Sequence, residues 1–330
     1  TFTCILKACG SMRAIDKGKQ IHNEIVSRGL LEKNIVLGNA LVDMYAKCGM
    51  LVNAWKVLNE LPVRNVVSWS ALIAGCIQQG NDQEALYCYE RMRSEGLSPD
   101  AITFTSVLKA CGSVRSFDLG KGIHEEVVRK GLLRKDTILG TALIDMYAKC
   151  GSMLKAQEVF NELITRNVVS WNAMIAVYTQ LELGKEALEL YYQMKKQGLV
   201  GNKVTFVSVL DACANEGLLG EGQTIHALMS KCAYDVDVIV GTAIVNMYNN
   251  CNSLQDGKRV FDLLPERNII SWNVMMSGFV RHGYGNDAVL LFDRMQSEGI
   301  CPNVFTFIAS LKACGNMGSI NKGIQIHEEI

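Results

Sequence analysis

The sequence predicts an all-α protein, an α-solenoid superhelix of stacked helix-turn-helix repeats. Three observations predict it: a pattern that returns about every 102 residues, apolar residues at helical spacing inside each repeat, and a composition that favours helices. Nearly half of the 330 residues are hydrophobic and only four are proline, so the chain can bury a core and helices can continue. No stretch approaches ~18 uncharged apolar residues, so no membrane-spanning segment is expected.

Three sequence strings define the period. TFTCILKACG at 1–10 returns, with substitutions, at 103–112, 205–214 and 306–315. MYAKCG at 44–49 returns at 146–151 and as MYNNCN at 247–252, and RNVVSW at 64–69 returns at 166–171 and as RNIISW at 267–272. We name the three kinds of repeat after these strings: LKACG-type, MYAKCG-type and VVSW-type.

Each predicted repeat ends at an Asn or Asp. The predicted repeats are 1–34 (partial), 35–65, 66–100, 101–136, 137–167, 168–202, 203–237, 238–268, 269–303 and 304–330 (partial). The chain begins inside one LKACG-type repeat and stops inside another, so it is expected to be a fragment of a longer array.

Each repeat predicts two helices. Trp69, Leu72, Ile73 and Cys76 fall at i, i+3, i+4 and i+7, and the other kinds of repeat show the same apolar stripe. Glycines are predicted at helix C-termini: Gly10, Gly49, Gly112 and Gly151 after first helices, and Gly96, Gly198 and Gly299 after second helices. A single hairpin cannot bury its stripe alone, so neighbouring hairpins are expected to stack around a continuous core.

Catalytic chemistry is not expected. The pairs His22/Glu24, His124/Glu126 and His327/Glu329 satisfy H-x-E, the first half of a zinc deaminase signature, but the second half, P-C-x-x-C, is missing. Because the His recurs with the repeat, it is interpreted as a packing residue. The prediction is therefore a non-enzyme with no cofactor and no metal site.

The strings resemble the pentatricopeptide repeat (PPR) family, and the alternation of 36-, 31- and 35-residue repeats resembles its plant PLS subclass. LKACG followed by Ile-His resembles the L motif, MYAKCG the S motif, and VVSWNAMI with EALELYYQM the P motif. The resemblance implies single-stranded RNA binding with one base per repeat, in a chloroplast or mitochondrion. It further implies an RNA-processing factor for C-to-U editing, with editing-complex proteins as partners and any deaminase-like domain beyond Ile330.

Two positions per repeat are predicted to read a base. Position 5 of the first helix is usually small or polar, and the last residue is always Asn or Asp; an Asp acceptor suits guanine or uracil, and an Asn amide suits adenine or cytosine. The last residue also fits an ordinary helix N-cap, and that alternative stays open. The predicted reading pairs are Thr3/Asn34, Asn39/Asn65, Ser70/Asp100, Thr105/Asp136, Thr141/Asn167, Asn172/Asn202, Val207/Asp237, Thr242/Asn268 and Asn273/Asn303.

By family resemblance these pairs imply the target 5′-A-Y-G-G-A-Y-n-A-Y-3′, where Y is C or U. The pair Val207/Asp237 departs from the pattern and is read as n. Position 2 is predicted to sandwich the bases, through Val36, Val67, Ile102, Ile138, Val169, Val204, Ile239 and Ile270. Phe305 occupies the same position in the last repeat.

Position 13 offers candidate phosphate contacts, Lys47, Lys149 and Arg281. The alternative is a solvated basic side chain at a helix C-terminus, which the helix dipole favours. A rival for the whole chain is an α-solenoid scaffold that binds proteins. The balance of 33 basic and 33 acidic residues favours this rival somewhat, since zero net charge argues against RNA binding by bulk charge alone.

Overall fold

The computed structural model describes residues 1–31, 34–134, 136–230 and 237–330. These residues form twenty α-helices and no strand, which confirms the all-α prediction. They divide into two compact parts, the N-terminal body (Thr1–Arg166) and the C-terminal body (Asn167–Ile330), and each is described by itself. In the described ranges, no helix is both long enough and apolar enough to cross a membrane.

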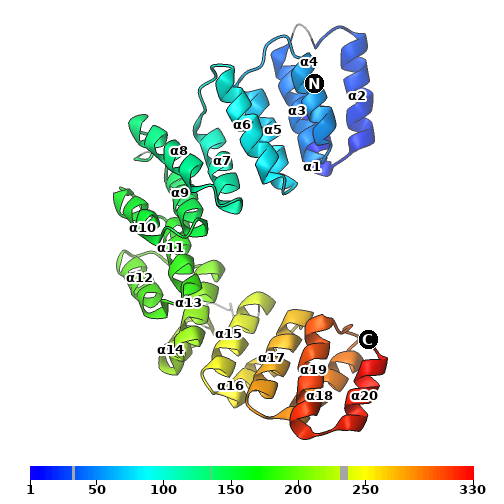
Figure 1. The fold of residues 1–330 in the computed structure, drawn as a ribbon, viewed down its shortest axis with the longest axis vertical. Coiled ribbons are helices and arrows are strands. Elements are labelled where there is room, and N and C mark those ends of the chain that lie inside the picture. The colour runs from blue at the N-terminus through cyan, green and yellow to red at the C-terminus, as the bar shows by residue number, and fades with distance from the viewer. Residues whose placement is uncertain (32–33, 135, 231–236) are drawn as a thin grey trace. The chain divides into compact units, whose positions relative to one another are not determined.

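The N-terminal body contains ten helices (Figure 1). They are α1 (Phe2–Met12), α2 (Ile15–Ser27), α3 (Ile35–Lys47), α4 (Leu51–Glu60), α5 (Val66–Gln78), α6 (Asp82–Ser94), α7 (Ala101–Ser113), α8 (Phe117–Arg129), α9 (Thr137–Lys149) and α10 (Met153–Glu162).

The C-terminal body contains the other ten. They are α11 (Val168–Gln180), α12 (Gly184–Lys196), α13 (Lys203–Glu216), α14 (Leu219–Ser230), α15 (Val238–Asn250), α16 (Leu254–Leu263), α17 (Ile269–Arg281), α18 (Gly285–Ser297), α19 (Val304–Met317) and α20 (Ile320–Glu328).

Within each body the helices form two layers. The odd-numbered helices pack side by side in chain order, and each even-numbered helix packs on the odd-numbered helix before it. Most even-numbered helices also contact the odd-numbered helix that follows, so each hairpin is held to the next. This arrangement is the predicted α-solenoid of stacked helix pairs.

The predicted apolar stripes form the core between the layers. Trp69, Leu72, Ile73 and Cys76 are at most 1% exposed. In the last complete VVSW-type repeat, Trp272 packs edge-to-face on Phe261 of α16, with ring centroids 4.9 Å apart. Aromatic burial of this kind is among the largest contributions to helix packing.

The predicted glycine caps are right at most positions and wrong at two. Gly49, Gly151, Gly96, Gly198 and Gly299 follow their helices with φ between 76° and 78°, the left-handed conformation that favours glycine.

Gly10 and Gly112 instead lie inside α1 and α7, which continue to Met12 and Ser113. A Cβ at Gly10 would stand 3.3 Å from the Cα of Met44, and a Cβ at Gly112 would stand 3.3 Å from the Cα of Met146. These glycines allow neighbouring helices to approach closely.

Candidate nucleic-acid interface

A row of apolar side chains lies exposed along the odd-numbered helices. Each is the second residue of its helix, and each is between 58% and 71% exposed, whereas the apolar stripe of the same helix is buried. The row comprises Val36, Val67, Ile102 and Ile138 in the N-terminal body, and Val169, Val204, Ile239, Ile270 and Phe305 in the C-terminal body. Apolar residues that recur along a body without being buried indicate a binding surface on that body.

Every predicted boundary residue is the N-cap of the helix that follows. One side-chain oxygen of each accepts a hydrogen bond from a backbone N–H of that helix's first turn. The capping alternative is therefore confirmed. These N-caps are Asn34, Asn65, Asp100, Asp136, Asn167, Asn202, Asp237, Asn268 and Asn303.

Capping does not consume the atom by which Asn and Asp differ. The cap bonds of Asn34 and Asp100, for example, both involve Oδ1. The remaining atom is an Nδ2 donor in Asn and an Oδ2 acceptor in Asp. A cap of either type thus presents a second, chemically distinct group at the start of its helix.

In two VVSW-type repeats the predicted reading pair is directly joined. Asn172 donates from Nδ2 to Oδ1 of Asn202 at 3.0 Å. Asn273 makes the same bond to Asn303 at 3.1 Å. In the first such repeat, Thr103 bridges the pair, because its hydroxyl lies 2.6 Å from the Ser70 hydroxyl and donates to Asp100 at 2.7 Å.

Within each body, the other pairs lack a direct bond between their side chains in the described ranges. The hydroxyls of Thr105, Thr141 and Thr242 donate to the backbone carbonyl four residues earlier, which leaves their oxygen lone pairs as acceptors. Thr3 is half-buried, and Asn39 is discussed below. Thr141 and Asn167 belong to different bodies.

The pair Val207/Asp237 differs from all the others. Val207 offers no polar atom, and Oδ2 of Asp237 is bound by the Lys203 ammonium. The hydrogen bond from Lys203 lowers the pKa of Asp237. The side-chain atom that capping does not use in the other N-caps is therefore bound to Lys203 in Asp237.

A cavity of about 400 Å³ lies at the last of these pairs, in the C-terminal body. Its wall combines two side chains of the exposed apolar row, a reading pair and the basic residue at position 13. It is lined by Asn246, Asn249, Asn250, Ile270, Asn273, Val274, Ser277, Gly278, Arg281, Asn303 and Phe305. Ile270 and Phe305 come from consecutive odd-numbered helices, α17 and α19.

The three basic residues at position 13 lie in the last turn of their helices. Lys47 pairs with Asp43 and Lys149 with Asp145, each at 2.7 Å, and both lysines remain more than 40% exposed. Arg281 donates to Asn250 at the cavity wall. The helix-dipole alternative fits this placement, and so does contact with a phosphate that passes the row.

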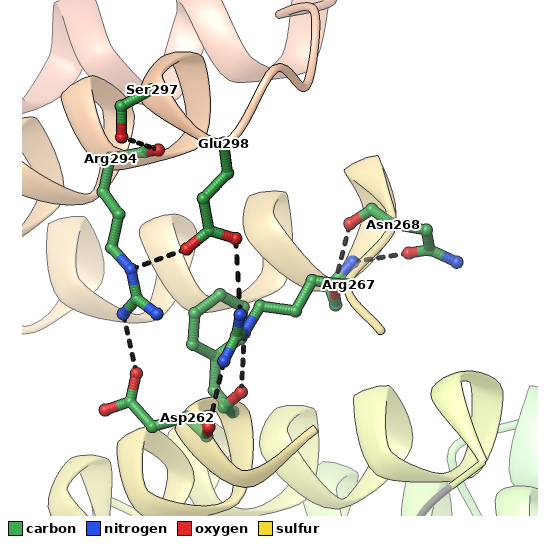
Figure 2. A network of polar contacts seen from close by, with 8 residues as sticks. Asp262, Arg267, Asn268, Arg294, Ser297 and Glu298 are labelled. Carbon is green, nitrogen blue, oxygen red and sulfur yellow. Dashed lines mark hydrogen bonds and ion pairs between the residues drawn. The ribbon is translucent and has the colours of Figure 1, made fainter. Parts of the chain in front are cut away.

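An arginine network anchors one boundary residue (Figure 2). Arg267 donates to the carbonyl oxygens of Phe261 and Asp262 at 3.0 and 2.9 Å, and pairs with Glu298. Arg294 joins Glu298 to Asp262 from α18. The network ties the end of α16 to the residue immediately before the N-cap Asn268, so it fixes where α17 begins.

Sequence reasoning missed one group of residues at this site. Thr103, Thr205 and Thr306 are the third residues of α7, α13 and α19, and all are fully buried beside the reading pairs. Their signal was a polar residue recurring in TFT, TFV and TFI within an otherwise apolar stripe.

Family models and relatives account for most of the chain. The model described as the PPR repeat family matches residues 64–113, 166–215 and 267–316, and the PPR repeat model matches 1–30, 39–66, 102–132 and 141–168. A chloroplastic pentatricopeptide repeat-containing protein of Arabidopsis thaliana is 34% identical over 99% of this chain and 52% of its own length. A mitochondrial one from the same plant is 34% identical over 96% of this chain and 57% of its length. The chain thus spans little more than half of these relatives.

A solved structure shares the fold. The pentatricopeptide repeat protein PPR10, in complex with an 18-nt psaJ RNA element, superposes with a TM-score of 0.78 at 19% identity, over 94% of this chain and 47% of that one. The sequence matches, together with this helix-pair architecture, show that the chain belongs to the pentatricopeptide repeat family.

Proposed function

We propose that this chain is a sequence-specific single-stranded RNA-binding module that reads one base per repeat. The predicted target is 5′-A-Y-G-G-A-Y-n-A-Y-3′. We further propose that the array is of the PLS subclass and serves as the recognition part of a C-to-U editing factor in a chloroplast or mitochondrion. The observation that carries the proposal is the exposed apolar row beside N-caps whose distinguishing atom remains available.

The apolar row supports stacking on the faces of bases. Within each body, exposed apolar side chains from consecutive odd-numbered helices offer two apolar surfaces for a base between them. A base has an apolar face whatever its identity, so this contact tolerates any sequence. It supplies affinity that does not depend on net charge, which matters for a chain with equal numbers of acidic and basic residues.

The caps and position 5 support discrimination between bases. In the cavity at Asn273/Asn303, a base between Ile270 and Phe305 would meet amide groups at its edge and Arg281 on the phosphate side. Each well-placed polar contact to a base edge distinguishes bases by ~1–3 kcal/mol. Asp237, whose carboxylate is paired with Lys203, and the apolar Val207 fit the assignment of the seventh nucleotide as n.

Relatives point to the same activity. PPR10, which shares the fold, is described in complex with an RNA element, and the Arabidopsis relatives are described as chloroplastic or mitochondrial. The organellar location and the RNA target of this chain are proposed on that basis.

The substitution Asp100→Asn tests the proposal. Asn keeps the Oδ1 that caps α7, so the free energy of unfolding should change little, while the outward atom changes from acceptor to donor. Affinity should shift from G toward A at the third nucleotide, by roughly 1–3 kcal/mol in difference. Affinities for four RNAs that differ only at that nucleotide measure the shift.

Asp237→Asn is the matched control, because Val207, the other member of its pair, offers no polar atom to a base edge. It should leave the base preference at every nucleotide as in the parent. Equal affinity of parent and Asp100→Asn for all four RNAs would refute base reading. An array that binds none of them would instead favour the protein-scaffold alternative.

A further inference from the structure

We infer that the buried hydroxyl of Thr205 is a positioning element that sets which polar atoms the pair Asn172/Asn202 presents to a nucleotide. Thr306 has the same role for Asn273/Asn303. Both threonines belong to the hairpin that follows the reading pair, so each base-reading unit takes a third member from its neighbour. The inference rests on the proposed function, since it concerns the selectivity of that same site.

The contacts of Thr205 form a closed set. Its side chain is fully buried, and its Oγ1 lies 2.6 Å from Oδ1 of Asn172. The backbone N–H of Asn202 donates to the same Oγ1 at 3.0 Å. Oδ1 of Asn202 in turn accepts from the backbone N–H of Thr205 at 3.1 Å and from Nδ2 of Asn172 at 3.0 Å.

These bonds allow one orientation of each amide. Turning over the Asn172 amide would place its oxygen against the Asn202 oxygen, which would set two acceptors together. Turning over the Asn202 amide would place its NH₂ against the Thr205 backbone N–H, which would set two donors together. The Asn202 NH₂ therefore points away from the network, as a fixed hydrogen-bond donor.

The hydroxyl is what holds Asn172 in this arrangement. Its single proton goes to Asn172 Oδ1, the shorter of its two acceptor contacts, since the Asn202 oxygen lies 3.2 Å away. Asn172 is only 6% exposed, so without that proton its oxygen would be a buried acceptor with no donor. Such a group costs free energy and would rotate to find another partner.

The second site reproduces the first. Oγ1 of Thr306 lies 2.7 Å from Oδ1 of Asn273 and accepts from the backbone N–H of Asn303 at 3.2 Å. Oδ1 of Asn303 accepts from the backbone N–H of Thr306 at 3.0 Å. In the N-terminal body, Thr103 bridges a serine and an aspartate, so the hydroxyl keeps its place when the reading pair changes.

An internal contrast shows what happens when the hydroxyl at this place donates elsewhere. The pair Asn39/Asn65 has the same two residue types, but the third residue of the next helix is Ser68. The Ser68 hydroxyl donates to the backbone oxygen of Asn65 at 2.8 Å. Oδ1 of Asn39 is buried and, in the part of the chain that the structure describes, has no hydrogen-bond partner. The same amide pair is thus held at two sites and left partly free at a third.

The experiment measures base selectivity at the sixth nucleotide, defined as the ratio of the weakest to the tightest dissociation constant among RNAs with A, C, G or U there. Thr205→Val removes the hydroxyl with little change of shape. Thr224→Val is the matched control, because Thr224 is exposed on α14 and its hydroxyl bonds only its own helix. Thermal unfolding establishes that each variant is folded.

We expect Thr205→Val to lower selectivity at the sixth nucleotide about tenfold. Thr224→Val should keep the parent ratio, and in Thr205→Val selectivity at the other nucleotides should not change. A folded Thr205→Val that keeps the parent ratio would overturn the inference. So would a loss of affinity that is equal for all four RNAs, because it would indicate a purely structural role.

The parent chain alone provides a second measurement if Thr205→Val does not fold. Selectivity at the second nucleotide, read by Asn39/Asn65, should be lower than at the sixth and ninth. Equal ratios at the three nucleotides would overturn the inference while leaving base reading intact. A parent that shows no selectivity at any nucleotide would refute the proposed function itself, and this inference with it.

Discussion

The imidazole of His22 on α2 contacts the phenol hydroxyl of Tyr45 on α3, with 2.9 Å between Nδ1 and the Tyr45 oxygen. The rings meet edge-to-face, and the same pair recurs as His124/Tyr147 and His226/Tyr248. Each pair joins the second helix of one hairpin to the first helix of the next. His22 and His124, two of the histidines that resemble half of a zinc signature, are therefore cross-hairpin contacts.

These pairs predict a loss of stability in acid. Burial lowers the pKa of His22 and His124, only partly offset by Glu60 and Glu162. Among the residues that the structure describes, the Nε2 atom of each is buried and has no hydrogen-bond partner. The unfolded chain then binds more protons, so this contribution is complete above a pH of about 6.5 and is lost as the pH falls below it.

Urea unfolding at pH 7.5 and 5.5 measures this loss. The double variant His22→Gln/His124→Gln should lose less stability between the two pH values than the parent. Carboxylates titrate alike in both proteins, so the difference isolates the histidines. An unchanged pH dependence in the double variant would contradict the prediction.

The close approach of α3 and α5 predicts that replacing the glycine between them will destabilise the fold. A Cβ at Gly75 would lie 2.4 Å from the Cβ of Ala46 and 3.0 Å from its Cα, so Gly75→Ala must push the helices apart. We expect a loss of about 1–3 kcal/mol in the free energy of unfolding. Gly122→Ala, inside α8 with open space around it, should instead stabilise by roughly 0.5–1 kcal/mol. Two losses of equal size would argue against the steric explanation.

The arginine network predicts a strong stability effect at Arg267. Its side chain is 16% exposed, pairs with Glu298 and lies over the ring of Phe261, with 5.3 Å from the guanidinium carbon to the ring centroid. Arg267→Ala should lower the free energy of unfolding by about 2 kcal/mol, since two carbonyls and a carboxylate lose their donor. Arg259→Ala removes a 78% exposed arginine and should have almost no effect. Equal thermal midpoints for the two variants would show that the network is not stabilising.

The residues at position 13 predict a change in salt dependence. If Lys47, Lys149 and Arg281 each contact a phosphate, replacing all three by Gln should reduce the slope of log K against log salt by about 2, from ~0.7 per contact on a single strand. Replacing the exposed Lys195 and Lys196 at the end of α12 removes two charges away from the exposed apolar row and serves as the control. If the triple variant has the same slope as the parent, these residues do not contact phosphates, and the helix-dipole explanation of their placement stands.

Helix starts were predictable from the sequence because the signal for them is local. An Asn or Asp before an apolar run caps its own backbone, and all nine such residues do so. Helix ends were less so: Gly10 and Gly112 look like caps in sequence, yet their role depends on Met44 and Met146 from the next hairpin.

The threonines of the reading pairs were missed for a similar reason. Within its own helix Thr205 is one more small residue in a buried stripe, and its importance appears only when Asn172, 33 residues earlier, is placed beside it. The exposed row was predictable in position, because it falls off the packing stripe, but its exposure is a property of the stack.

In each N-cap one side-chain atom starts the helix and the other faces outward, and this separation has an evolutionary consequence. An Asp-to-Asn exchange, which a single nucleotide change can bring about, alters the outward atom while the helix keeps its start. On the proposed function, such an array can drift to a new transcript through intermediates that all fold, so selection on binding is separated from selection on stability.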